Sequence, residues 1–400
     1  MVLTSELRRK LNGSFSFLNG HSKKLSVCFV GCYPPTRGRL AEYSYYLIEE
    51  LHRFPQIGKL EIIADAEGDY TTERINSKIT LHRVWKADKP ASLLLIPLKI
   101  LRLKPHVIHF NVHMAVFGRS RIANFVGLSL PFVCRLMGFK TLVSLHNITE
   151  TIDVEKAGFS NTLLNRLGAF VAIKLLTLAS VITLTVRSYL GVLETRYKCK
   201  KALWIPHGTW ETHQSNGNNH SNPKRILYIG HTGPYKDLEL LFAAFEKLSQ
   251  RRKDVKLVIA GSSHPNYPGF LEGFESVNSK RNVEFTGYVP EDQLPSLFEK
   301  ASVVILPYYT CTGTSGVAHL ASSYGVPIIA TDLPEFRELA DEGCGIVLSL
   351  HDPELLAEKM EEVLDDLDLS SKLVRRNLLF AQKRTWDKIA GSFYEVYEHI

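Results

Sequence analysis

The segment that decides the fold is VVILPYYTCTGTSGVAHLASSYGVPIIATDLPEFRELADEGCG, residues 303–345. It begins with an apolar run, VVIL, which predicts a buried parallel strand ending at Pro307. A loop of small residues follows (TGTSG, 312–316), then the helix-like VAHLASSY and a second apolar strand, VPIIAT. This βαβ pattern places the loop at a helix N-terminus, where free backbone N–H groups favour a phosphate. A tight turn of small residues explains the loop alone equally well.

Length and composition indicate a globular protein with more than one core. Four hundred residues favour two domains, and the apolar content of 45% with 22% charged residues is typical of a folded globular chain. The six cysteines form no CxxC pair, which favours reduced thiols in a cytosolic compartment and argues against a zinc site. Residues 1–24 lack the apolar core of a secretion signal, and no run approaches the roughly 20 apolar residues that span a bilayer.

The charge is unevenly distributed along the chain. The net charge is +7, but residues 1–200 hold 28 Lys and Arg against 14 Asp and Glu (+14), and residues 201–400 hold 20 against 27 (−7). A basic first half suits an anionic membrane surface or a phosphorylated acceptor, although a solvated basic surface explains it as well. No aromatic and basic patch typical of nucleic-acid binding is present, so we expect no nucleic-acid partner.

Two segments of the first half mix apolar and basic residues. LLLIPLKILRLK (93–104) and FVGLSLPFVCRLMGFK (125–140) have the composition of helices that lie on an anionic leaflet, and equally that of core helices with basic ends. We therefore expect a cytoplasmic protein, with peripheral association at the inner membrane face as an open possibility.

Alternating strands and helices predict an α/β protein with two doubly wound, Rossmann-like domains facing across a cleft. The expected organisation is a leader (1–24), an N-terminal domain (25–208), a polar linker TWETHQSNGNNHSNP (209–223), a C-terminal domain (224–380) and a final helix (381–400) that docks back on the first domain.

Five motifs in this order resemble the GT-B fold glycosyltransferases of the retaining family 4, over nearly the whole chain. The first is CYPPTRGRLAEYSYYL (32–47), similar to the family's glycine loop before the first helix. Gly38 matches the first glycine, which lets the backbone approach a diphosphate, and Arg39 replaces the second. IPHG (205–208) resembles the segment that closes the family's first domain.

The motif SLHNITE (144–150) resembles the family's strand-end histidine, which faces the transferred sugar. The resemblance implies a catalytic role for His146 and an acceptor-side position for Asn147, although a lone loop histidine is more often structural. His113, with His109, resembles a neighbouring strand end on the acceptor side.

The motif YIGHTGPYKDLELL (228–241) resembles the family's donor clamp, in which an arginine and a lysine hold the donor diphosphate. Lys236 matches the lysine and is the expected diphosphate ligand and second catalytic residue. His231 stands at the arginine position, where a neutral imidazole holds an anion more weakly, and Asp237 replaces a glycine.

The opening segment departs from the family, which carries two glutamates eight positions apart here. Thr312 and Leu320 occupy those positions, and leucine cannot accept a hydrogen bond from a ribose hydroxyl. The loop still offers backbone N–H groups and a hydroxyl to the donor, so its residues are candidate donor ligands: Gly313, Thr314, Ser315 and Gly316. Glu335 and Glu338, in PEFRELADEG, are candidates for the missing ribose contact, or solvated helix carboxylates.

No cofactor and no essential metal are expected. The only Asp-x-Asp spacing is Asp366-Leu367-Asp368, in a polar helix where a solvated face explains it. The diphosphate charge would instead be offset by Lys236, Arg39 and helix N-termini.

The resemblance implies a hexosyltransferase of carbohydrate biosynthesis that moves a sugar from a nucleotide diphosphate sugar, with UDP- or GDP-sugars the expected donors. The acceptor would be a hydroxyl group, and the anomeric configuration would be retained. Two alternatives remain: a nucleotide-sugar epimerase or phosphorylase of the same fold, and a catalytically inactive GT-B-like binding subunit, which the missing glutamates favour.

Overall fold

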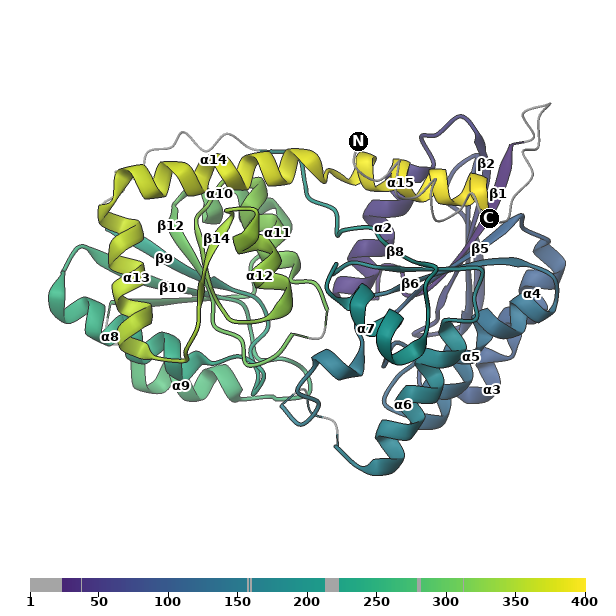
Figure 1. Ribbon diagram of the computed structural model, residues 1–400, viewed down its shortest axis with the longest axis horizontal. Helices are drawn as coiled ribbons and strands as arrows, with labels where there is room; N and C mark the ends of the chain where they lie inside the picture. Colours follow the sequence, from purple (N-terminus) through teal and green to yellow (C-terminus); the bar gives the residue numbers. More distant parts are fainter. Residues whose placement is uncertain are drawn as a thin grey trace. The chain divides into compact units, whose positions relative to one another are not determined.

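The computed structural model describes residues 24–36, 38–156, 158, 160–212, 223–278, 282–311 and 313–400. Residues 1–23 of the expected leader and 213–222 of the expected linker lie outside the described part. The chain divides into two compact units (Figure 1). Unit 1 comprises Met1–Thr151, Ser160–Gly208 and Trp386–Ile400, and unit 2 comprises Ile152–Phe159 and Thr209–Thr385.

Unit 1 contains an eight-stranded sheet in the order β3-β4-β2-β1-β5-β6-β7-β8. All neighbouring strands are parallel except β3, which pairs antiparallel with β4. The strands are β1 (Leu25–Val30), β2 (Ile57–Asp65), β3 (Thr71–Arg74), β4 (Ile79–Trp85), β5 (Val107–Val112), β6 (Lys140–Leu145), β7 (Val181–Leu184) and β8 (Ala202–Trp204). The helices are α2 (Arg39–Leu51), α3 (Pro90–Leu93), α4 (Leu95–Leu103), α5 (Arg121–Leu136), α6 (Leu163–Leu176), α7 (Tyr189–Tyr197) and α15 (Trp386–His399), with a 3-10 turn η1 (Thr149–Thr151).

Unit 2 contains a six-stranded parallel sheet in the order β11-β10-β9-β12-β13-β14. Its strands are β9 (Lys224–Ile229), β10 (Val255–Ala260), β11 (Val283–Gly287), β12 (Ala301–Leu306), β13 (Ile328–Thr331) and β14 (Gly345–Leu348). Its helices are α8 (Leu238–Arg251), α9 (Phe270–Asn278), α10 (Leu294–Glu299), α11 (Gly316–Ser323), α12 (Pro334–Asp341), α13 (Pro353–Asp365) and α14 (Leu367–Lys383), with a 3-10 turn η2 (Glu291–Gln293).

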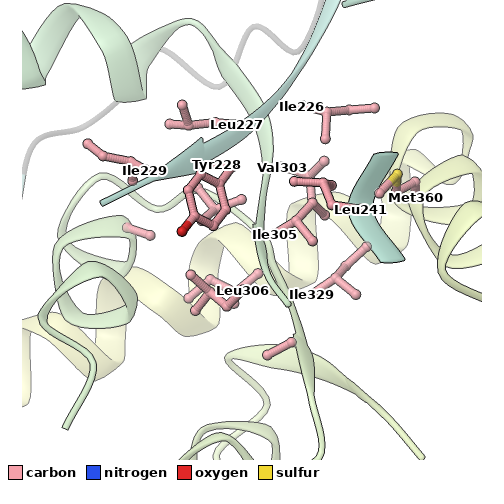
Figure 2. Packing of buried hydrophobic residues seen from close by; sticks show 14 of the residues in the cluster. Ile226, Leu227, Tyr228, Ile229, Leu241, Val303, Ile305, Leu306, Ile329 and Met360 are labelled. Carbon is pink, nitrogen blue, oxygen red and sulfur yellow. The ribbon is translucent and has the colours of Figure 1, made fainter. Parts of the chain in front are cut away.

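The central strands of unit 2 are apolar almost throughout because helices cover both faces of a parallel sheet. Figure 2 shows side chains of β9 and β12, including Ile226 and Ile305, packed with Leu241 of α8 and Met360 of α13. All four of these side chains are buried. The expected doubly wound domains are therefore confirmed in each unit by the sheet order and the buried strands.

The last helix, α15, contributes to the core of unit 1. Trp386, Ile389 and Phe393 of this helix are buried in one cluster with Val27 and Phe29 of β1. α15 also lies against α2. Unit 1 is therefore assembled from segments that lie before and after unit 2 in the sequence.

Several boundaries differ from the expected ones. Ile152–Phe159 belongs to unit 2, although the sequence placed it in the first domain. One of its contacts there is the Asp153 N–H, which donates to the Thr310 hydroxyl. The first linker residue, Thr209, is buried and donates from its N–H to the Arg384 carbonyl, so this part of the linker is packed. The boundary at 380 falls inside α14, since the chain remains helical to Lys383.

Candidate active site

The order of the strands in each sheet identifies the place where a ligand is expected, at the carboxyl ends of two central strands. In unit 2 the chain runs outward from β9 to β10 and β11, and then returns to β12 on the other side of β9. The loops that follow β9 and β12 therefore diverge to opposite sides, and ligands of doubly wound sheets bind at such a point. In unit 1 the equivalent point lies between β1 and β5.

The loop between β12 and α11 has the geometry expected of an anion seat. Ser315 is the N-cap of α11, and its hydroxyl accepts a hydrogen bond from the Ala318 N–H at 3.4 Å. Gly313 has a φ of 137°, a conformation that favours glycine. Gly313, Ser315 and Gly316 are buried, Thr314 is half-buried, and Thr312 lies outside the described residues. Of the first N–H groups of α11, that of Ala318 bonds to Ser315, whereas those of Gly316 and Val317 precede the first bond within the helix and lie at the positive end of its dipole.

A buried carboxyl group reaches this loop from the first turn of α12. Oε1 of Glu335 accepts a hydrogen bond from the Ser315 N–H at 2.5 Å, and the Cys311 thiol lies 3.7 Å from Oε2. Burial raises the pKa of Glu335 to about 8, with a smaller raising effect from Glu338, while the two hydrogen bonds and Lys236 act in the opposite direction. Glu335 is therefore largely a neutral acid at pH 7. Glu338 is half-buried one turn further along α12.

Lys236 lies at the edge of this seat, in the loop that follows β9. A β-bridge joins Lys236 to Tyr308, and its ammonium lies over the Tyr308 ring. Its charge lowers the pKa of both Glu335 and Cys311, in each case against the larger effect of burial. The structure thus places Lys236 near Cys311 and near Glu335, which bonds to the predicted loop at Ser315, and the role of Lys236 as a diphosphate ligand stays a prediction.

Asp237, which replaces a glycine of the family motif, has a structural explanation. It is buried at the N-cap of α8, where its Oδ1 accepts from the Leu240 N–H at 3.1 Å. Its Oδ2 lies 2.6 Å from Nδ1 of His351. Carboxylates are favoured N-caps because they satisfy free helix N–H groups.

His231 occupies the start of the same loop and is exposed to solvent. It follows Gly230, whose carbonyl would collide with a Cβ on Gly261. Two glycines thus allow the ends of β9 and β10 to approach closely. The His231 ring lies 5.8 Å from that of His264, and its role as a donor ligand stays a prediction.

Gly38 and Arg39 lie at the start of α2 in unit 1. Gly38 is the N-cap, with a φ of 131°, so the helix start requires a residue that tolerates positive φ. The Arg39 side chain lies outside the described part of the structure, and its contact with a diphosphate stays a prediction.

His146 follows β6 and is buried in unit 1. Its Nε2 lies 2.6 Å from Oδ1 of Asn111, and the Asn111 amide donates to the Ser44 hydroxyl at 3.0 Å. Because that amide is turned toward Ser44, its oxygen is left to accept from His146, and Nδ1 of His146 carries the lone pair. Burial, with smaller contributions from neighbouring histidines, holds the pKa of His146 well below its usual range. The ring is therefore a neutral hydrogen-bond acceptor rather than an acid.

The neighbouring candidates of unit 1 have different environments. His109 is fully buried between Tyr397 (2.6 Å) and Ser144 (2.7 Å), so its ring packs in the core of unit 1. His113 is half-buried, and its Nδ1 accepts from the Ala115 N–H at 3.1 Å. Asn147 is buried and accepts from the Met114 N–H at 2.9 Å. Both hold the segment after β5, and their acceptor-side role stays a prediction.

Two neighbours of the predicted residues were missed. Asn111 orients His146, and its signal is a polar amide inside the apolar strand VIHFNV. Cys311 lies beside Glu335, but only the three-dimensional structure shows this, because 24 residues separate them in the chain.

Within the described residues, no group of three or more His, Cys, Asp or Glu side chains could hold a metal ion. Asp366, of the Asp-x-Asp spacing, caps α14 by accepting from the Leu369 N–H at 2.9 Å. The expectation that no metal is required stays a prediction. No helix among these residues has the length and apolar character needed to cross a bilayer.

Comparison with known proteins shows which of them the chain is similar to. Residues 223–366 match the family Glycosyl transferases group 1. The chain resembles the glycosyltransferases. It is 30% identical over 179 residues to an uncharacterized glycosyltransferase of Methanocaldococcus jannaschii, covering 44% of this chain and 45% of the relative. It is 26% identical over 183 residues to phosphatidyl-myo-inositol mannosyltransferase of Mycolicibacterium smegmatis, covering 44% and 45%. The glycosyltransferase-like chain thus spans less than half the length of these curated relatives.

Solved glycosyltransferase structures match the fold over nearly the whole chain. Sucrose-phosphate synthase from Thermosynechococcus elongatus aligns with a TM-score of 0.73 and 17% identity, covering 93% of this chain and 98% of that one. HepE of Anabaena, in complex with UDP-glucose, aligns with a TM-score of 0.69 and 15% identity, covering 94% and 100%. The resemblance inferred from the motifs, and with it the GT-B fold class, is confirmed.

Proposed function

We propose that the protein is a glycosyltransferase that moves a sugar from a nucleotide diphosphate sugar to a hydroxyl acceptor. The observation that carries the proposal is that Lys236 lies over Tyr308, at the divergence point of β9 and β12, and acts electrostatically on Glu335, which accepts a hydrogen bond from the Ser315 N–H. This geometry lies in the segment that matches the glycosyltransferase family. The HepE structures in complex with UDP and with UDP-glucose support a nucleotide-sugar donor.

In this proposal unit 2 binds the donor. The first N–H groups of α11 and the Ser315 hydroxyl bind phosphate oxygens, and the Lys236 ammonium balances the charge that develops on the leaving diphosphate. Gly313 and Gly316 allow the backbone to come close to the phosphate. Glu338 and His231 are the candidate contacts to the ribose and the diphosphate.

Unit 1 then binds the acceptor, and His146 contacts the transferred sugar. Because Nε2 of His146 donates to Asn111, Nδ1 is the nitrogen available to accept a hydrogen bond from a sugar hydroxyl. Retention of configuration and a hexose as the transferred group are part of the proposal, on the resemblance to family 4.

A second candidate is a protein that binds the donor without turning it over. Leu320, at the position of a family glutamate, is buried in the core of unit 2 and cannot replace that carboxylate. This observation favours a binding subunit that has lost catalysis.

The test combines donor binding with turnover. Calorimetric titration with UDP-, GDP- and ADP-sugars should identify one nucleotide, and Lys236→Ala should weaken its binding by about 10- to 100-fold, as expected for a charged hydrogen bond. Lys247→Ala is the matched control, because Lys247 lies on the surface of α8, where it forms an ion pair with Glu354 of α13. Release of nucleoside diphosphate in the presence of acceptor alcohols supports a transferase. Binding without release supports the second candidate, and equal donor binding by Lys236→Ala and wild type refutes the site.

A further inference from the structure

Unit 1 exposes an unusual set of large apolar side chains. Nineteen large hydrophobic residues are exposed among the described residues, and eleven of them lie between positions 94 and 171. They are Leu94, Leu95, Leu98, Leu101, Ile122, Phe125, Leu136, Leu163, Leu164, Leu167 and Val171. We call the faces of α4, α5 and α6 that carry them, with Leu94 just before α4, the apolar–basic surface.

The exposed residues follow helical spacing, so each helix presents a stripe. Leu94, the N-cap of α4, is followed by Leu98 and Leu101 at spacings of four and three residues. Leu163, Leu167 and Val171 are spaced by four along α6. Residues at these spacings share one face of a helix. Ile96 and Ile100 of α4 are buried against the unit, so α4 is apolar on its inner and its outer face. A water-facing helix normally has a polar outer face.

The charges between these stripes all have one sign. The helices α3, α4, α5 and α6 contain no Asp or Glu, whereas α4, α5 and α6 each contain two Lys or Arg residues. Arg121 is the first residue of α5, where the helix dipole disfavours a cation. The dipole favours Arg102, Arg135 and Lys174, which lie in the last turns of α4, α5 and α6, so helix stability explains these three cations. It does not explain Arg121 or the absence of acidic residues, which suit a negatively charged partner.

The stripes belong to neighbouring helices. α5 contacts α3, α4 and α6, and Figure 1 shows this group of helices together in unit 1. Several stripes therefore lie close together in unit 1.

We propose that the apolar–basic surface binds an anionic lipid bilayer. Leucine, isoleucine and phenylalanine side chains enter the boundary between headgroups and acyl chains, while Lys99, Arg102 and Arg121 reach the phosphates of the headgroups. A protein partner would need an acidic and apolar surface of its own, whereas an anionic leaflet offers both properties over any area. The proposal is independent of the sugar chemistry, because it rests on unit 1 helices and not on the candidate donor site.

The test is flotation of the full chain with vesicles of phosphatidylcholine alone or mixed with phosphatidylglycerol. The wild type should bind the mixed vesicles, and 0.5 M NaCl should weaken binding because salt screens surface charge. The pair Lys99→Gln and Arg102→Gln should reduce the partition coefficient about tenfold or more. The pair Leu98→Ser and Leu101→Ser, at residues 53% and 46% exposed, should do the same with little effect on folding.

Matched controls separate membrane binding from general effects of losing surface leucines. Leu350 and Leu367 of unit 2 are 64% and 58% exposed, and replacing both with serine should leave vesicle binding unchanged. A second pair, Ile122→Ser and Leu164→Ser, repeats the test on α5 and α6 if the first pair unfolds. Absence of vesicle binding, equal binding to both lipid mixtures, or equal losses in the control pair would each overturn the proposal. If the wild type does not bind vesicles but forms a dimer, and the changes at Leu98 and Leu101 dissociate that dimer, the surface would instead bind a second copy of the chain.

Discussion

The replacement Glu335→Gln tests whether a buried acid controls the proposed anion seat. Glutamine has nearly the same shape, and its carbonyl oxygen can still accept the Ser315 N–H. It removes only the ability to ionise. Asp341→Asn on the same helix is the matched control, because Asp341 is exposed. Cys311 does not contribute to the pH dependence below pH 9, because burial raises its pKa to about 12 and the thiol stays neutral.

The stability effect follows from the raised pKa of Glu335. Below its ordinary value of 4.5 the carboxyl is protonated in both the folded and the unfolded chain. Between that value and about 8 the folded protein holds a proton that the unfolded chain has lost, so the unfolding free energy falls as pH rises. With about 1.4 kcal/mol for each pKa unit, the wild type should lose about 3 kcal/mol from this group between pH 6 and 9.

The binding effect follows from the same ionisation. Two unit charges about 5 Å apart, at an effective dielectric constant of about 20, repel by about 3 kcal/mol, which is about 100-fold in affinity. Lys236 moderates this repulsion, and Glu338 adds to it. The affinity of the wild type for UDP should therefore fall between pH 7 and 9, while that of Glu335→Gln should fall much less.

Urea unfolding at pH 6 and 9, with calorimetric titration of UDP at pH 7 and 9, measures both effects. The expected result is that Glu335→Gln flattens both pH dependences and Asp341→Asn flattens neither. Parallel pH profiles for the wild type and Glu335→Gln would refute the buried-acid reasoning. A flattened stability profile with unchanged UDP binding would separate Glu335 from the anion seat.

Three further changes test the framework of the site by urea unfolding. Gly261→Ala should lower the free energy of unfolding by about 1–3 kcal/mol, because a φ of 133° is strained for alanine and the new Cβ meets the Gly230 carbonyl. The control is Gly273→Ala in α9, which has open space around it and should leave stability unchanged or raise it. Asn111→Ala should cost about 1–3 kcal/mol because it leaves the His146 N–H unsatisfied, and an unchanged stability would contradict the assigned tautomer. Tyr397→Phe should cost a similar amount by removing the hydrogen bond to His109, and should speed amide exchange in α15; unchanged exchange would mean that this bond does not hold the helix.

The sequence predicts those features that local patterns determine. Apolar runs such as VVIL and RILYI identify the central strands because burial on both faces removes polar residues. Two edge strands were not predicted. β3 (TTER) is fully exposed and has no apolar pattern, and β14 (GIVL) is short. The loop at Ser315 and Lys236 were found from motifs, since a helix N-terminus and a nearby lysine suit phosphate by local chemistry.

Contacts between distant segments could not be read from the chain. The resemblance placed His109 with His113 at an acceptor-side strand end, but the hydrogen bond with Tyr397 of α15 holds the His109 ring in the core. Glu335 had the pattern of an ordinary helix carboxylate, and only its burial against Ser315 explains its raised pKa. The composition of residues 93–104 fitted either a helix on a membrane surface or a core helix with basic ends. The exposure of Leu98 and Leu101 favours the first interpretation.

The position of α15 has a consequence for biosynthesis. The cluster around Val27 and Phe29 includes Trp386 and Phe393, which the ribosome adds only after all of unit 2. At about 5–20 residues per second, the first strands of unit 1 wait many seconds for this part of their core. All segments of unit 2 are synthesised before α15, so unit 2 can complete its fold before unit 1. During that interval the apolar residues of unit 1 that α15 later covers are exposed to solvent.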